Sequence, residues 1–233
     1  MRNFGSYVSN GEFSVGCTGR TVYIYDKDNN ELGQFKDITY GYKPLISPDG
    51  KMVAVKSTEG RFAVYSLETV SLIKKFRFSK VDGAQDDNFC FSPDSKFLIN
   101  LERQIDSLHS AISVYDTIDF SLVNQIILSR DMMLSNIEYD EESASYYVLG
   151  FERGADRCAS KFFVAQLVDL QIVNITYIPE EENWSYRYNK SLKISGFTKK
   201  ANEFSRSNYA LEDLKPKKRS LAELYNRYNK TSE

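Results

Sequence analysis

The segment Ser47-Pro48-Asp49-Gly50-Lys51 most constrains what this chain can fold into, because a near copy of it, Ser92-Pro93-Asp94-Ser95-Lys96, follows 45 positions later. In both copies an apolar run precedes the segment and another follows it. Proline fixes φ at a value suited to a turn, and glycine adopts positive φ without strain. The repeated segment therefore predicts a hairpin turn between two strands, used at least twice.

The stretches around the two turns repeat as well. After each turn come an apolar strand, a second turn, a β-branched or aromatic strand (Arg61–Ser66 and Ala111–Asp116), and a fourth short strand. A weaker version of this order opens the chain at Tyr7–Phe35, and a more diverged version runs from Asn136 to Ile175. Four-stranded units repeating about every 40 to 47 residues are typical of β-propeller blades.

Over residues 4–178, this pattern of a Ser-Pro-Asp-Gly-Lys turn and a later strand ending in Tyr-Asp resembles the WD-repeat and related propeller families. The resemblance implies a scaffold rather than a reaction. The family's Trp-Asp pair is replaced here by Tyr25-Asp26, Tyr65-Ser66 and Tyr115-Asp116, and its Gly-His signature is missing. The hydrogen-bond network of true WD repeats therefore cannot be transferred to this chain.

The predicted fold class is all-β: a small β-propeller of four to five four-stranded antiparallel blades, with a C-terminal helix. If residues 184–197 form part of a fifth blade and Met1–Gly5 adds a closing strand, the ring has five blades. Otherwise the four units form a four-bladed ring or an open arc, whose end sheets need a partner because unpaired strand edges are a liability. We place the propeller at residues 1–197 and a separate tail at residues 198–233.

The tail is predicted to be a polar and basic linker followed by an amphipathic helix. Ser220 is a suitable N-cap, and Glu223 stands at the capping-box position. Four apolar or aromatic residues share one helical stripe: Leu221, Leu224, Tyr225 and Tyr228. This helix either packs its stripe on the sheets or binds a partner, with the basic run 215–219 as a tether.

Composition bounds the compartment and the partners. The 233 residues carry a formal net charge of −2, which argues against a dedicated nucleic-acid binder. The first residues lack the apolar core of a secretory signal, and no apolar run is long enough to span a membrane. Three widely spaced cysteines fit reduced, buried thiols. We expect a cytoplasmic protein with no nucleic-acid and no membrane partner, and the oligomeric state stays open.

Catalytic and metal-binding patterns are weak. The chain has one histidine, His109, in a polar stretch where we expect an exposed loop, and the cysteines do not stand at metal-ligand spacings. The acidic stretch Asp26–Glu31 has Glu31 where a calcium loop requires glycine, so we interpret it as a hairpin turn. The sequence thus predicts a protein that is not an enzyme and uses no cofactor or metal. A propeller enzyme or small-ligand binder using the central channel remains the alternative.

Binding to another protein is the favoured function. An arginine stands at or beside the turn between the second and third strands of every unit: Arg20, Arg61, Arg103 and Arg153. Tyr40 and Tyr42 lie in a connection between units, which reaches the same face of a propeller. Arginine and tyrosine are the residues that most often anchor interfaces. These six residues are the predicted site for a protein or peptide partner with acidic and aromatic features, the alternative being solvated loop charges.

Overall fold

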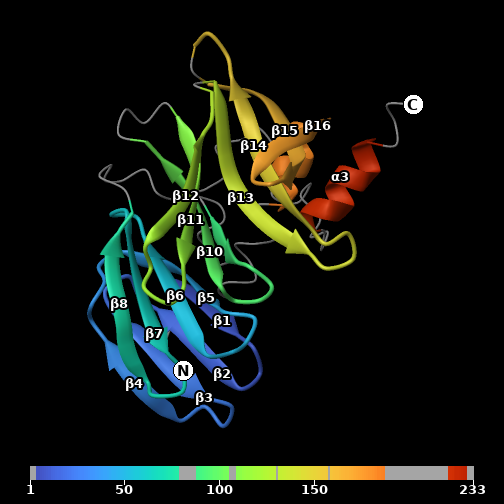
Figure 1. The fold of residues 1–233 in the computed structure, drawn as a ribbon. Helices are drawn as coiled ribbons and strands as arrows, with labels where there is room; N and C mark the ends of the chain where they lie inside the picture. The colour runs from blue at the N-terminus through green and yellow to red at the C-terminus, as the bar shows by residue number, and fades with distance from the viewer. Residues whose placement is uncertain are drawn as a thin grey trace. The chain divides into compact units, whose positions relative to one another are not determined.

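The computed structural model describes residues 4–78, 88–104, 109–129, 131–156, 158–186 and 220–229. These form two compact units, one within residues 1–128 (unit 1) and one within residues 129–233 (unit 2). Together they contain four antiparallel four-stranded sheets, in each of which strands consecutive in sequence pair (Figure 1). The predicted all-β fold built from four-stranded blades is confirmed. None of the described helices is long and apolar enough to cross a membrane.

Unit 1 holds three of the sheets. The first sheet comprises β1 (Ser6–Ser9), β2 (Phe13–Cys17), β3 (Val22–Asp26) and β4 (Glu31–Phe35). The second comprises β5 (Gly41–Ile46), β6 (Met52–Ser57), β7 (Arg61–Ser66) and β8 (Ser71–Arg77). The third comprises β9 (Phe89–Phe91), β10 (Phe97–Arg103), β11 (Ser110–Asp116) and β12 (Leu122–Ile127).

Unit 2 holds the fourth sheet and the helical segments. Its strands are β13 (Met132–Asp140), β14 (Ser145–Arg153), β15 (Ala159–Val168) and β16 (Gln171–Ile178). Residues 180–186 are helical, and the helix α3 spans Leu221–Asn229.

The second sheet is packed on both faces, and strand alternation explains how. Val53 and Val55 of β6 belong to a buried cluster shared with the first sheet. Their neighbour Ala54, with Phe62 and Val64 of β7, belongs to a second cluster shared with the third sheet. Four consecutive positions of each middle strand, 52–55 in β6 and 62–65 in β7, are therefore apolar or aromatic, as is typical of strands covered on both sides.

The two repeated turns are built alike. The Ser47 hydroxyl donates a 2.6 Å hydrogen bond to the Asp49 carboxylate and accepts one of 3.1 Å from the Met52 amide. In the third sheet the Ser92 hydroxyl donates to Asp94 at 2.7 Å and accepts from the Phe97 amide at 2.9 Å. The shared side-chain bonds explain why serine and aspartate recur at these turn positions.

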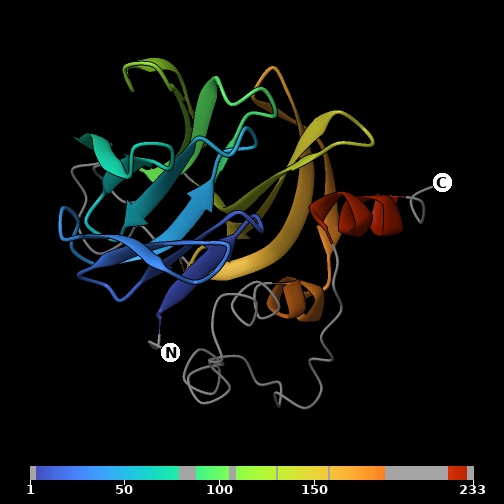
Figure 2. The same cartoon turned by 90° about the horizontal axis from the view of Figure 1, so that it is seen from below.

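The predicted tail helix is present with its capping box. The Ser220 hydroxyl accepts a 3.1 Å hydrogen bond from the Glu223 amide, and the Glu223 carboxylate accepts one of 2.9 Å from the Ser220 amide. Leu221, Leu224 and Tyr225 are buried in a cluster with side chains of the fourth sheet. Figures 1 and 2 show α3 beside that sheet. Packing on a sheet, one of the two predicted roles of this helix, is thus observed.

Three sequence-based expectations need correction. Residues 184–186 are helical rather than a strand of a fifth blade, and residues 187–197 lie outside the described residues, as does the predicted domain boundary after residue 197. Phe4 and Gly5 belong to no strand, although the Gly5 amide bonds the Cys17 carbonyl at 2.8 Å. Cys17 and Cys90 are buried, but Cys158 is exposed. Burial raises the pKa of the Cys17 thiol to about 12.

Candidate functional site

Each predicted arginine lies at the same end of its own sheet, the end that holds the turn between the second and third strands. Arg20 lies between β2 and β3, Arg61 is the first residue of β7, and Arg103 is the last residue of β10. Tyr40 and Tyr42 flank the first residue of β5, which pairs with the last residue of β6. These five residues define the arginine end of unit 1.

A short link joins the first two sheets at this end. The Gly41 amide donates a 3.1 Å hydrogen bond to the Gly19 carbonyl, forming an isolated antiparallel bridge. The bridge places Arg20 and Tyr40, each next to one of these glycines, at adjoining sheet ends. Backbone pairing thus brings together two residues of the predicted site that are far apart in the sequence.

Tyr40 is the most exposed of the tyrosines at this end. Its side chain is 57% exposed, and its φ is +52°, in the left-handed region that side chains other than glycine seldom adopt. The Thr58 amide bonds the Tyr40 carbonyl at 3.3 Å, and the Ser57 hydroxyl bonds the Thr39 carbonyl at 2.5 Å. The neighbouring turn therefore holds a backbone conformation that turns the ring outward.

Several cationic residues stand toward this end of the second sheet. Arg61 is the register partner of Arg77 on β8, and the Lys43 ammonium lies 5.4 Å from the centre of the Tyr42 ring. Glu59 lies at the same turn, where its carboxylate accepts a 2.6 Å hydrogen bond from Thr39. The end of the second sheet thus combines several cations with two tyrosines, a composition suited to carboxylate and aromatic groups.

A buried polar cluster lies next to Arg103 on β10, and the sequence did not predict it. The Lys56 side chain is fully buried, and its ammonium donates a 2.6 Å hydrogen bond to the Leu101 carbonyl, linking the second and third sheets. Glu102 accepts hydrogen bonds from Asn100 at 2.9 Å and from Gln125 at 2.9 Å. Burial raises the pKa of Glu102, while Lys56 and the hydrogen bonds act in the opposite direction.

A signal for this cluster was present in the sequence. Lys56 directly follows the apolar residues of β6, which are buried on both faces of the sheet. A lysine ammonium buried there needs a hydrogen-bond or ion-pair partner.

Arg153 occupies the equivalent position in unit 2, as the last residue of β14. Its amide donates a 2.7 Å hydrogen bond to the Asp131 carbonyl. Arg153 therefore shares the topological position of the other three arginines, whereas the bridge and the charges described above belong to unit 1.

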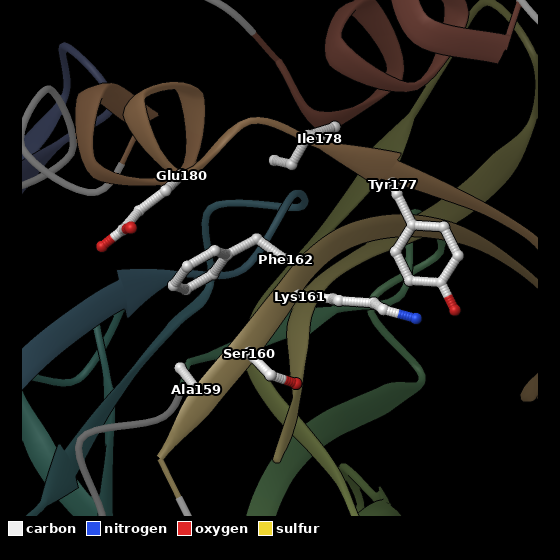
Figure 3. A pocket seen from close by; sticks show the side chains of 7 residues that line it. All are labelled: Ala159, Ser160, Lys161, Phe162, Tyr177, Ile178 and Glu180. Atoms are coloured by element: carbon white, nitrogen blue, oxygen red, sulfur yellow. The ribbon is translucent and has the colours of Figure 1, made fainter. Parts of the chain in front are cut away.

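A shallow, open hollow of about 240 Å³ lies at this same end of the fourth sheet (Figure 3). Phe162 and Ile178 form its apolar part; Glu180 lies on one side of the Phe162 ring, and Lys161 and Tyr177 lie on the other. The Tyr177 hydroxyl donates a 2.5 Å hydrogen bond to Glu152, whose carboxylate lies 3.9 Å from the Lys161 ammonium. The hollow is smaller than the 300–1,000 Å³ typical of small-molecule sites.

The described residues offer little for catalysis or metal binding. Nδ1 of His109 lies 2.9 Å from the Leu128 carbonyl oxygen, on a half-buried ring rather than the exposed one predicted. Within the described ranges no three His, Cys, Asp or Glu side chains are grouped to hold a metal ion. The Asp26 carboxylate accepts bonds from the Asp28 and Asn30 amides at 2.9 and 2.8 Å, which fits the predicted hairpin turn.

Comparison with solved structures identifies the fold. The chain is similar to hydrazine synthase of Kuenenia stuttgartiensis, with a TM-score of 0.58 and 15% identity over 73% of this chain and 52% of that chain. It is similar to the WD40 domain of coronin from Toxoplasma gondii, with a TM-score of 0.55 and 15% identity over 72% of this chain and 43% of that chain. The fold is that of a small β-propeller.

A third similar structure is the β-propeller domain of the trilobed protease from Pyrococcus furiosus, described as having an open velcro topology. Its TM-score is 0.51, with 19% identity over 75% of this chain and 56% of that chain. The chain spans about half the length of the solved chains it matches. No family model and no curated protein matches the sequence. The resemblance to WD-repeat proteins is therefore one of fold.

Proposed function

We propose that this chain is a non-enzymatic interaction module whose arginine end binds a protein or peptide partner with acidic and aromatic side chains. The Gly41–Gly19 bridge is the observation that carries the proposal, because it joins Arg20 and Tyr40 at one surface. Arginine forms bidentate hydrogen bonds with carboxylates, and tyrosine supplies rigid contact area. The presence of a WD40 domain among the similar structures supports an interaction role.

The composition of the arginine end favours its being a binding site for a partner rather than a set of loop charges that are only solvated. Tyr40 exposes more than half of its side chain, and Arg20 is also exposed. Arg61 is half-buried beside Arg77, so their side chains lie close together on paired strands. Two guanidinium groups on neighbouring strands suit a carboxylate of a partner, which can accept hydrogen bonds from both.

A defined peptide array tests the proposal. Labelled peptides that combine Asp or Glu with Phe, Tyr or Trp are screened by fluorescence polarisation against the wild type and against Arg20→Ala/Arg61→Ala. We expect at least about tenfold weaker binding by the variant, because a hydrogen bond to a charged group contributes about 1.5–3 kcal/mol. Binding should also weaken as salt increases.

The matched control is Lys51→Ala/Lys96→Ala, which removes the same charge from exposed residues of the two repeated turns, at the opposite ends of their sheets. This variant should bind like the wild type. If both variants lost affinity equally, or if no acidic and aromatic peptide bound the wild type, the assignment to the arginine end would be wrong.

A further inference from the structure

The surface that α3 covers, formed by the fourth sheet and the helical segment 180–186, has the composition of a helix-binding groove. We call this surface the α3 groove; its residues are Glu138, Tyr147, Phe162, Val164, Ile178 and Glu182. Leu221 and Leu224 of α3 are completely buried in it, and Tyr225 lies against Tyr147 with ring centres 5.3 Å apart. Apolar anchors at i, i+3 and i+4 are the usual basis of helix recognition in a groove.

Carboxylates bind α3 near both of its ends. The Leu221 amide donates a 2.8 Å hydrogen bond to Glu138, which suits the positive end of the helix dipole. Near the other end, Glu182 lies 3.4 Å from the Arg227 guanidinium and accepts a 3.3 Å hydrogen bond from the Tyr228 hydroxyl. The groove therefore fixes the direction of the helix as well as its apolar face.

A buried tyrosine belongs to the same cluster as the anchors of α3. Burial, together with the negative charge of Glu138, raises the pKa of Tyr186. Tyr186 is the last described residue of the helical segment that follows β16, and the described residues of the groove lie at positions 138–186. The helix that fills it starts at position 221.

Recognition of α3 rests on side chains and one backbone amide rather than on continuity of the chain. In the sequence, 33 residues (187–219) separate the groove from Ser220. A fully extended chain of that length spans about 100 Å, so the number of residues alone permits α3 to reach a second copy. A nine-residue helix is marginal by itself in water, so its stability comes from the groove.

We propose that the α3 groove also accepts α3 from a second copy of this chain, so that two copies associate by exchanging their C-terminal helices. A reciprocal exchange fills both grooves with the contacts described above, which makes it a low-cost route to a dimer. The chain's own α3 competes at high effective concentration, so exchange increases with protein concentration. This association is separate from peptide binding at the arginine end, which belongs to unit 1.

Trapping between two different chains tests the exchange. One chain carries Glu138→Cys and the other Ser220→Cys, both with Cys158→Ser to remove the exposed thiol. The chains are mixed, and glutathione disulfide oxidises the two thiols to one disulfide while it is reduced to two glutathiones. We expect a mixed covalent dimer in about tenfold higher yield than from a control pair of Lys74→Cys and Ser220→Cys. Equal yields from the two pairs would overturn the proposal.

Binding of the isolated segment provides a second test. A labelled peptide of residues 220–233 is titrated against the wild type and against the full chain with Leu221→Asp and Leu224→Asp, whose own helix cannot dock. The variant should bind the peptide about tenfold or more tightly, because it lacks the intramolecular competitor. Ser220→Ala/Glu223→Ala, which weakens docking without placing charge near the sheet, should show a smaller gain.

The control is the same peptide with Leu224→Asp, which should not bind. If the wild type and both variants bound the two peptides equally, the α3 groove would not be a site for a separable helix. That result would leave the arginine end untouched, because its peptides are measured in a separate assay on unit 1 residues.

Discussion

The backbone amide of Asp49 donates a 3.1 Å hydrogen bond to the side-chain hydroxyl of Ser95. Ser95 occupies the position in its turn that Gly50 occupies in the turn of the second sheet, and both have positive φ, +60° and +72°. The second turn thus differs from the first by having serine in place of glycine, and this serine accepts the hydrogen bond that joins the two turns. A side chain at positive φ carries a cost that this hydrogen bond offsets.

Replacing Ser95 should separate these two effects. Ser95→Ala keeps the strained φ and loses the hydrogen bond, so we expect the free energy of unfolding to fall by about 1–2 kcal/mol. Ser95→Gly also loses the bond but relieves the strain, so its loss should be smaller. Urea unfolding of the two variants measures the difference, and a glycine variant less stable than the alanine variant would contradict this explanation.

Gly150, in the middle of β14, should not tolerate a side chain. A Cβ at this position would overlap the Met133 carbonyl oxygen and come within 2.6 Å of the Phe163 ring. Because backbone and a packed ring must both shift, Gly150→Ala should cost about 1–3 kcal/mol of stability, measured by urea unfolding. Gly11→Ala is the control: it has positive φ but no atom within 4 Å of the added carbon, so its cost should come from backbone strain alone.

Glu102 should make stability depend on pH. Its pKa is raised above the ordinary 4.5, mainly by burial, so the folded protein holds the proton more tightly than the unfolded chain. Its contribution to stability is therefore present at low pH and is lost as pH rises from 4.5 through the raised value. Glutamine at this position cannot titrate, so Glu102→Gln does not lose this contribution. The stability of Glu102→Gln relative to the wild type should therefore increase as pH rises through this range.

The measurement for Glu102 is urea unfolding of both proteins at several pH values from 4 to 8. Lys56 and the hydrogen bonds from Asn100 and Tyr115 favour the charged form and limit the effect. The difference in the free energy of unfolding between the two proteins should shift toward Glu102→Gln as pH rises. If it stayed constant, or shifted toward the wild type, Glu102 would not have a raised pKa in the folded protein.

The capping box should control how firmly α3 is docked. Ser220→Ala removes the acceptor for the Glu223 amide, and loss of an N-cap costs about 1 kcal/mol. Hydrogen exchange of the α3 amides should accelerate accordingly while that of β14 stays unchanged. Asn226→Ala, an exposed substitution within the same helix, serves as the control and should not speed exchange.

Several parts of the structure could be predicted because their causes are local. The paired turns depend on Ser47 and Asp49 bonding amides within five positions, and the capping box of Ser220 and Glu223 spans three. The helix at 180–186 also had a local signal that we missed. Pro179 followed by Glu180, Glu181 and Glu182 is a helix start, and the Trp184 indole bonds Glu180 one turn back at 2.9 Å.

The sequence by itself determined the four-stranded repeat, its turns and the tail helix, because each depends on residues within a few positions of one another. Only the tertiary structure decided that Gly19 pairs with Gly41, that Lys56 is buried against Leu101, and that Glu138 receives the amide of Leu221. Each of these contacts joins residues at least 22 positions apart. Such pairs leave no periodic pattern in the sequence, since they depend on how separate strands and helices pack.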